Sequence, residues 1–270
     1  MSTCTWLARL GLLAVMAAAA PATGRAAPSA PAAIAAIDLA GPFDTRSPWR
    51  FTATQGPAAA DPASLPGDEA PGAVTLCLRS GASGPCDPQL QTPLRAPASN
   101  DDLFVTPHYL GRADVAPGAA GRPLLLVQTA SLHSGDGDQL VLTQALAYER
   151  AADRFVRVYS HLTGRNNNQE VRFIETGALK GDIISAEPTE NAPYGFWISV
   201  NVLTSAPAYK EVLRYRSATR YGDGNPLAVI DSEMANIEQR LGLWRPGAPP
   251  PLPAGACPKP HLVRMELWCR

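Results

Sequence analysis

The stretch Leu-Leu-Leu-Val-Gln-Thr-Ala-Ser-Leu at 124–132 decides how this chain folds. It begins with consecutive large apolar residues, and no polar side chain interrupts them before Gln128. A half-exposed strand alternates apolar and polar residues, so this continuous run predicts a β-strand that is buried on both faces. The run opens the segment 124–203, which contains most of the residues able to form a core.

Further segments with strand character surround this run, and the clearest alternation lies at 194–203. Residues two apart point to the same face of a strand, so one set there should face the core and the other should face away. The core set is Phe196, Ile198, Val200 and Val202, and the opposite set is Trp197, Ser199 and Asn201. The other expected strands lie at 48–54, 74–78, 103–105, 139–148, 154–162, 170–175, 183–184 and 209–216. Short strands separated by turns predict a mainly β fold, an antiparallel meander forming a sandwich or barrel.

One short helix is expected in the C-terminal half, at about 231–241. Asp231 or Ser232 is a suitable N-cap, and Gly242 is a suitable end. An apolar stripe would hold this helix across an open face or end of the sheet. The stripe consists of Met234, Ile237 and Leu241.

The first residues have the pattern of a secretory signal peptide, at 1–27. Arg9 ends a short leading region, the apolar run Leu10–Ala20 is too short to span a bilayer, and small residues follow. No later segment is apolar enough to be transmembrane. The formal net charge of −1 gives no reason to expect a nucleic acid partner. The mature protein is therefore expected to be soluble in the periplasm or secreted.

Composition divides the rest of the chain into three parts. Residues 28–72 are rich in Ala and Pro and are interpreted as a partly flexible leader. Residues 73–245 form a single mainly β domain, within which 114–123 and 187–193 are interpreted as loops. Residues 246–270 form a proline-rich tail with a disulfide-closed end.

The cysteines indicate disulfides. Removing 1–27 leaves an even number, which is typical of a disulfide framework in an exported protein. These residues are Cys77, Cys86, Cys257 and Cys269. Of the three possible connectivities, the local one is predicted, with Cys77 joined to Cys86 and Cys257 to Cys269. A zinc site is the rival interpretation, but the spacings lack the close cysteine pairs that such sites use.

No established catalytic motif occurs in the sequence. The most plausible general base is His161, paired with Glu170 or Glu175 across a hairpin, although a half-exposed strand histidine is the commoner situation. Two other groupings are weaker, because proximity in sequence does not create catalytic geometry. They are Ser131, His133 and Asp136 in one turn, and Glu187 with Glu190 in one loop.

The turn Ser134–Gln139 resembles the Asp/Gly-rich calcium loops of FG-GAP-type propeller repeats. Asp136 and Asp138 alternate with glycines, and alternate aspartates suit calcium. Asp-Gly is also the usual chemistry of a tight hairpin turn that holds no ion. We favour the plain turn and expect no cofactor or metal.

A cluster of aromatic and amide side chains is the most plausible binding site. Trp197, Tyr194 and Asn191 lie near one strand start, and with His161 they suit a sugar or peptide ligand. The sequence leaves open whether the protein is an enzyme and favours one that is not. The leading hypothesis is an exported binding or envelope-associated interaction protein with a protein or carbohydrate ligand. The alternatives are a secreted hydrolase and a calcium-stabilised β module.

Overall fold

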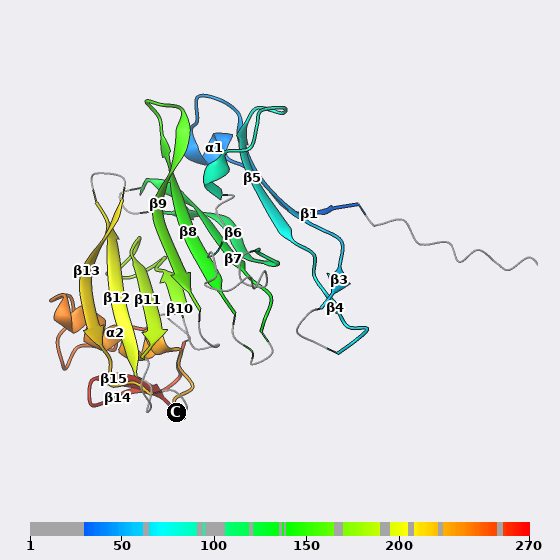
Figure 1. Cartoon of the computed structure of the whole chain (residues 1–270). Helices are drawn as coiled ribbons and strands as arrows, with labels where there is room; N and C mark the ends of the chain where they lie inside the picture. Colours follow the sequence, from blue (N-terminus) through cyan, green and yellow to red (C-terminus); the bar gives the residue numbers. More distant parts are fainter. Residues whose placement is uncertain are drawn as a thin grey trace, which may run out of the picture.

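A computed structural model describes most of the chain after residue 29. The described residues are 30–61, 65–90, 94, 106–118, 121–134, 137, 139–164, 170–189, 195–204, 208–220, 224–252 and 256–270. The expected signal peptide at 1–27 and the expected strand at 103–105 lie outside these ranges. Within them the chain is mainly β, and adjacent strands pair antiparallel, as predicted. Stacked open sheets form the body of the molecule (Figure 1).

The central sheet follows the chain in the order β6-β7-β8-β9. Its strands are β6 (Tyr109–Pro117), β7 (Pro123–Ala130), β8 (Val141–Glu149) and β9 (Arg154–Thr163). On β7, Leu124 and Leu126 belong to one hydrophobic core, whereas Leu125 and Val127 belong to another. The apolar run at 124–127 is therefore buried on both faces, as expected of a middle layer.

A second sheet covers the Leu125 face of this layer, in the order β1-β2-β5. Its strands are β1 (Ala32–Asp38), β2 (Trp49–Gln55) and β5 (Val74–Ser80). Phe51 of β2 packs in the same core as Phe155 of β9. The short elements nearby are α1 (Ala40–Phe43), β3 (Ala59–Ala60), β4 (Glu69–Ala70) and the 3-10 turn Pro88–Leu90. Strands β1 to β4 all lie within the segment 28–72.

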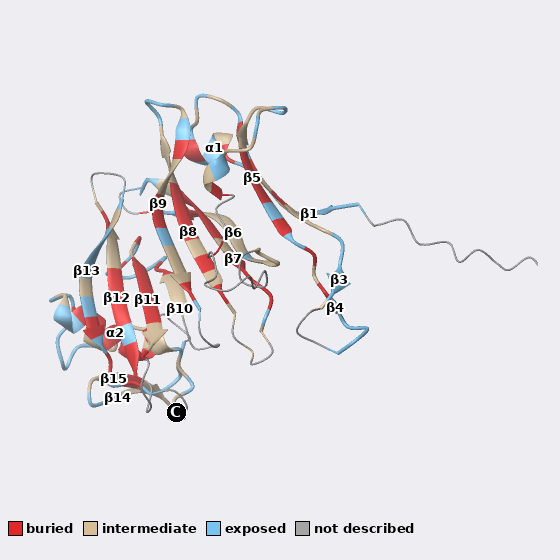
Figure 2. Ribbon diagram, in the orientation of Figure 1, coloured by how far each residue is buried: buried red, intermediate tan, exposed pale blue. Residues whose placement is uncertain are grey.

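A third sheet covers the Leu124 face, in the order β10-β11-β12-β13. Its strands are β10 (Glu170–Phe173), β11 (Ile183–Pro188), β12 (Phe196–Leu203) and β13 (Tyr209–Arg216). The alternation predicted for β12 holds only for the core residues from Phe196 to Val200, since Phe196, Ile198 and Val200 share one core. Ser199 is buried as well, and after a register shift at Val200 the half-buried Val202 lies outside that core while Leu203 joins the core shared with the central sheet. Buried residues therefore occur on both sides of β12 (Figure 2).

The helix α2 (Val229–Arg240) covers the outer face of this third sheet. It begins after Ala228, which gives no side-chain cap, so neither Asp231 nor Ser232 is the N-cap. The cap comes instead from Glu170 on β10, whose carboxylate accepts a hydrogen bond from the Ile230 N–H at 3.1 Å. Sequence patterns describe local caps, and this one comes from a strand sixty residues away.

A buried carboxylate fixes how α2 packs on the sheet. Glu233 is fully buried and accepts hydrogen bonds from the hydroxyls of Tyr215 at 2.6 Å and Thr219 at 2.5 Å. Asn236 donates a further bond at 3.1 Å. Buried polar groups are tolerated when they are fully hydrogen-bonded, so this network fixes the register between the helix and β13.

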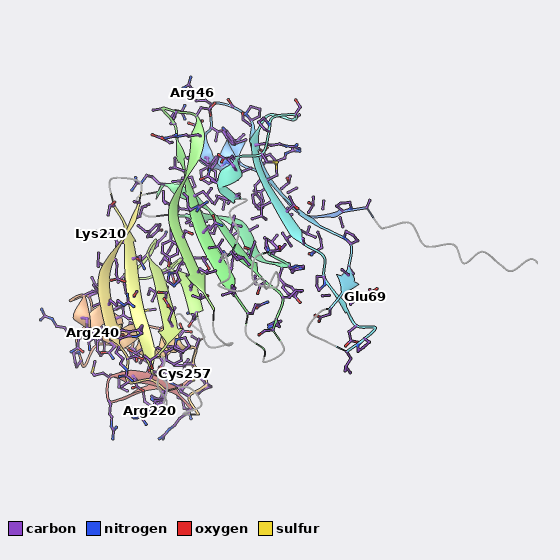
Figure 3. The ribbon with its side chains drawn as sticks, viewed as in Figure 1. Arg46, Glu69, Lys210, Arg220, Arg240 and Cys257 are labelled. Carbon is purple, nitrogen blue, oxygen red and sulfur yellow. A yellow bond between two sulfur atoms is a disulfide. The ribbon has the colours of Figure 1, made fainter. Side chains whose placement is uncertain are left out.

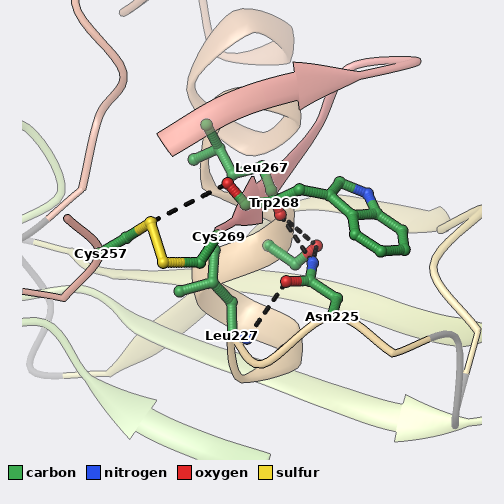
Figure 4. The surroundings of a disulfide bond; sticks show 7 residues. Asn225, Leu227, Cys257, Leu267, Trp268 and Cys269 are labelled. Atoms are coloured by element: carbon green, nitrogen blue, oxygen red, sulfur yellow. Dashed lines mark hydrogen bonds between the residues drawn. A yellow bond between two sulfur atoms is a disulfide. The ribbon is translucent and has the colours of Figure 1, made fainter. Parts of the chain in front are cut away.

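The chain ends in a hairpin of β14 (Pro260–Val263) and β15 (Glu266–Cys269), which packs on α2. The structure joins Cys257 to Cys269 and Cys77 to Cys86, the local connectivity that the spacing predicts. Beside the disulfide between Cys257 and Cys269, the Asn225 side chain donates a hydrogen bond to the Leu267 carbonyl at 2.7 Å (Figure 4). Arg46, near the β8–β9 turn, and Cys257 lie at opposite ends of the molecule (Figure 3).

Strands extend into both expected loops. The segment 114–123 was interpreted as a connection because of its Pro and Gly, yet β6 extends to Pro117, which pairs with Pro123 at the end of the ladder. Proline is tolerated there because the strand lies at a sheet edge. The expected loop 187–193 also begins later, since β11 continues through Pro188. No helix in the described ranges is long and apolar enough to cross a membrane.

Candidate functional site

A cavity of about 620 Å³ lies between β10, the turn that follows it, α2 and the proline-rich segment after α2. Its size is within the range of small-molecule sites, which are about 300–1,000 Å³. The apolar lining includes Ile174, Leu179, Met234, Trp244 and Leu252, and the charged lining consists of Arg112, Arg172, Glu175, Asp231 and Glu238. We call this space the α2 cavity.

One face of α2 forms a wall of the α2 cavity. Asp231, Met234 and Glu238 all line it, and side chains three, four and seven positions apart project from one face of a helix. Met234 belongs to the predicted packing stripe, and it does pack in the core beneath α2. This residue therefore serves both the core and the cavity wall.

The end of α2 turns the chain back over the cavity. Gly242 has a φ of +72° and donates to the Gln239 carbonyl at 3.0 Å, while Leu243 donates to the Glu238 carbonyl at 2.8 Å. This pair of bonds is a Schellman motif, which needs a residue that tolerates left-handed backbone. The predicted end at Gly242 is correct, and it places Trp244, which is 6% exposed, against the cavity.

The proline-rich segment closes one side of the cavity. The Trp244 indole N–H donates to the Pro249 carbonyl at 3.0 Å, and Pro249, Pro251 and Leu252 line the space. Proline restricts its own φ, so such a segment can hold its shape with few backbone hydrogen bonds. We call residues 244–252 the proline strap. Downstream, the bridge from Cys257 to Cys269 fastens the chain to β15.

The arginines at the cavity are paired with carboxylates. Arg172 forms ion pairs with Asp231 at 2.6 Å and with Glu170, and Arg112 forms ion pairs with Glu175 at 2.9 Å and with Asp114. Glu170 and Glu175 thus contact arginines of the sheets rather than His161.

His161 contacts a different acid from the ones predicted. Its Nε2 atom lies 2.7 Å from Oε1 of Glu187 on β11, and this contact lowers the pKa of Glu187. The prediction of a partner across a hairpin was wrong because β9 and β10 belong to different sheets. A register shift in β9 near Val158 accompanies this arrangement, and Tyr159 stacks on His161.

Trp197 lies beside this pair, because Glu187 and Trp197 are cross-strand partners. The tryptophan is 40% exposed, and the Arg214 guanidinium lies 5.3 Å from the centre of its ring. The structure therefore brings together two of the predicted binding residues, His161 and Trp197, around Glu187. Neither His161 nor Glu187 lines the α2 cavity.

Several other predicted site residues lie outside the described residues. These are Tyr194, Asn191, Glu190, Asp136 and Asp138. Ser131 is buried and bonds to backbone groups of Leu132 and Leu140, which is the role of a strand-end residue. Within the described ranges, no group of three or more His, Cys, Asp or Glu residues is arranged to hold a metal ion.

Sequence reasoning missed the α2 cavity as a site. Its walls come from β6, β10, α2 and the proline strap, which are brought together only by the tertiary fold. The only local signal was the pairing of a helix end at Gly242 with a following proline-rich segment. The chain matches no protein-family model, and comparison with curated proteins and with solved structures finds no significant similarity.

Proposed function

We propose that this is an exported binding protein that takes a small, largely apolar ligand into the α2 cavity. The observation that carries this proposal is the cavity itself, about 620 Å³ in volume, with Met234, Trp244 and Leu252 in its lining and charged groups beside them. Concave sites with apolar walls and a few polar groups are the usual form of a small-molecule site.

Two features support export. Both disulfides close short loops, and disulfides persist mainly in oxidising compartments. The sequence also begins with the pattern of a signal peptide at 1–27. A ligand site of this kind would then be open to molecules of the periplasm or the medium.

The test uses the uncharged dye N-phenyl-1-naphthylamine, whose fluorescence rises in an apolar site. We expect saturable binding by the wild-type protein. Ala178→Trp should remove it, because Ala178 is exposed and lines the cavity, so a large side chain there blocks the space without disturbing the core.

Val212→Trp is the matched control, since Val212 is 50% exposed on β13 and does not line the cavity. This variant should bind the dye like the wild type. Binding that does not saturate, or that survives unchanged in Ala178→Trp, would contradict the proposal.

A second candidate site is the surface around Trp197. An exposed indole beside the hydrogen-bonding groups of Glu187 and His161 suits stacking of a sugar ring. Hexasaccharides of glucose and of N-acetylglucosamine are suitable probes. Binding should be lost in Trp197→Ala and largely kept in Trp197→Phe, and equal binding by all three proteins would remove this candidate.

A further inference from the structure

Glu238 is a buried acid at the α2 cavity, and it has no side-chain partner in the part of the chain that the structure describes. It is 8% exposed and lines the cavity, yet its carboxylate makes no hydrogen bond or ion pair with any described residue. Burial alone raises its pKa. Burying an unpaired charge is unfavourable, and such groups normally find a counter-charge or a hydrogen-bond donor. The missing partner is therefore a group that a ligand could supply.

The neighbouring cations are already engaged. Arg172 binds Asp231 and Glu170, and Arg112 binds Glu175 and Asp114. Carboxylates thus outnumber arginines around the cavity, and among the described lining residues Glu238 is the carboxylate without an arginine partner. An anionic ligand would bring a like charge towards it, whereas a cationic ligand would neutralise it.

The walls near Glu238 define the rest of the ligand. Met234 lies one turn before it on α2, and Trp244 follows the end of the same helix. Met adapts its shape to irregular apolar groups, and aromatic faces attract cations. Leu252 adds an apolar surface from the proline strap.

We propose that the α2 cavity binds an organic amine, whose protonated nitrogen pairs with the Glu238 carboxylate and whose apolar body lies among Met234, Trp244 and Leu252. This inference rests on the proposed function, because it names the ligand class of the same cavity. It also explains why an acid without a partner among the described residues is held beside Met234 and Trp244.

The test compares three compounds that share one apolar body: 4-phenylbutylamine, 4-phenyl-1-butanol and 4-phenylbutyrate. Isothermal titration calorimetry on the wild-type protein should show the amine binding at least tenfold more tightly than the alcohol, with the carboxylate weakest. A charge-assisted hydrogen bond in a desolvated site is stronger than a neutral one, which gives the expected order.

Glu238→Gln tests the assigned residue. It removes the charge but keeps the size, so the amine should lose its advantage and bind within about threefold of the alcohol, while the affinity for the alcohol stays unchanged. Glu211→Gln is the control, because Glu211 is exposed on β13 and does not line the cavity. The comparison of compounds uses the wild-type protein, so it decides the inference even if Glu238→Gln folds poorly.

The outcomes separate this inference from the proposed function. Suppose that the naphthylamine dye binds. If the amine then has no advantage over the alcohol, or if none of the three compounds binds, the cavity is a ligand site and the amine inference is wrong. An amine advantage that persists in Glu238→Gln also overturns the inference. If neither the dye nor any of the compounds binds, both proposals fail.

Discussion

At the scale of single residues, Asp153 fastens the turn between β8 and β9 to the loop before β2. Its carboxylate accepts hydrogen bonds from the Ser47 hydroxyl, from the Tyr148 hydroxyl at 2.6 Å and from the Trp49 indole at 3.1 Å. These donors, Ser47 first, lower the pKa of Asp153 from 3.8 to about 2. Donors to an ionised carboxylate stabilise its charged form, so the folded state favours ionised Asp153.

The free energy of unfolding should therefore decrease at acidic pH as Asp153 becomes protonated. A group whose pKa is lower in the folded state stabilises the fold above its unfolded pKa, near 3.8, and this contribution disappears as the pH falls to about 2. Asp153→Asn should be less stable than the wild type at pH 7, and the two should converge near pH 2. Asn suits the left-handed backbone of this position, where φ is +49°. Urea unfolding between pH 2 and pH 7 measures the difference.

Asp68→Asn is the control for this experiment. Asp68 is exposed, so its substitution should change the free energy of unfolding little at pH 7. A difference for Asp153→Asn that stays constant between pH 2 and pH 7 would show that the carboxylate charge is not what holds the turn.

At the scale of elements, neighbouring residues of β12 differ in their cross-strand partners. Val200 is fully buried, and its cross-strand partners are Ile184 and Leu213. Ser199 is also buried, at 8% exposure, but its partner on β13 is Arg214. A carboxylate introduced at 199 would have a guanidinium within reach, whereas one at 200 would have only apolar neighbours.

We therefore expect Val200→Asp to lower the free energy of unfolding by about 4 kcal/mol or more, and Ser199→Asp by about 1 kcal/mol. Chemical denaturation followed by circular dichroism measures both. Similar losses would mean that Arg214 does not compensate the charge at 199.

The two disulfides close loops of similar length, with sequence separations of 9 and 12 residues. Replacing either pair by serine should cost roughly 3 kcal/mol by the loop-entropy estimate. The two variants should differ in binding. Only Cys257→Ser with Cys269→Ser frees the chain after the proline strap, so only this variant should bind the naphthylamine dye more weakly. Equal dye affinities would show that the strap holds without its bridge.

How much the sequence predicts depends on whether the signal is local. The core-facing set Phe196, Ile198 and Val200 and the end of α2 at Gly242 follow local patterns, and both are found in the structure. Beyond Val200 the predicted alternation of β12 fails, because the register shifts there. Strand β1 carries mostly alanine, which has little strand preference, and it forms by pairing with β2. The partner of His161 depended on which sheets its neighbours join, which no local pattern records.

At the scale of the whole molecule, the three larger sheets form a stack with β6 to β9 in the middle (Figure 1). We expect export to remove the leading segment, so that the mature chain begins between about Ala20 and Ala27. N-terminal sequencing of protein recovered from the periplasm or medium checks this. Mature, soluble protein that retains Met1 would contradict it.

The two-sided burial of β7 has a consequence for the order in which the chain folds during synthesis or translocation. Strands β6 to β9 pair with sequence neighbours, so the middle layer can assemble early from local hairpins. Its first cover, β1, β2 and β5, emerges before it, but β10 to β13 emerge after it. Of the two faces of the middle layer, the one bearing Leu124 and Leu126 is therefore shielded later. Chaperone capture or aggregation of a stalled chain should begin on that surface.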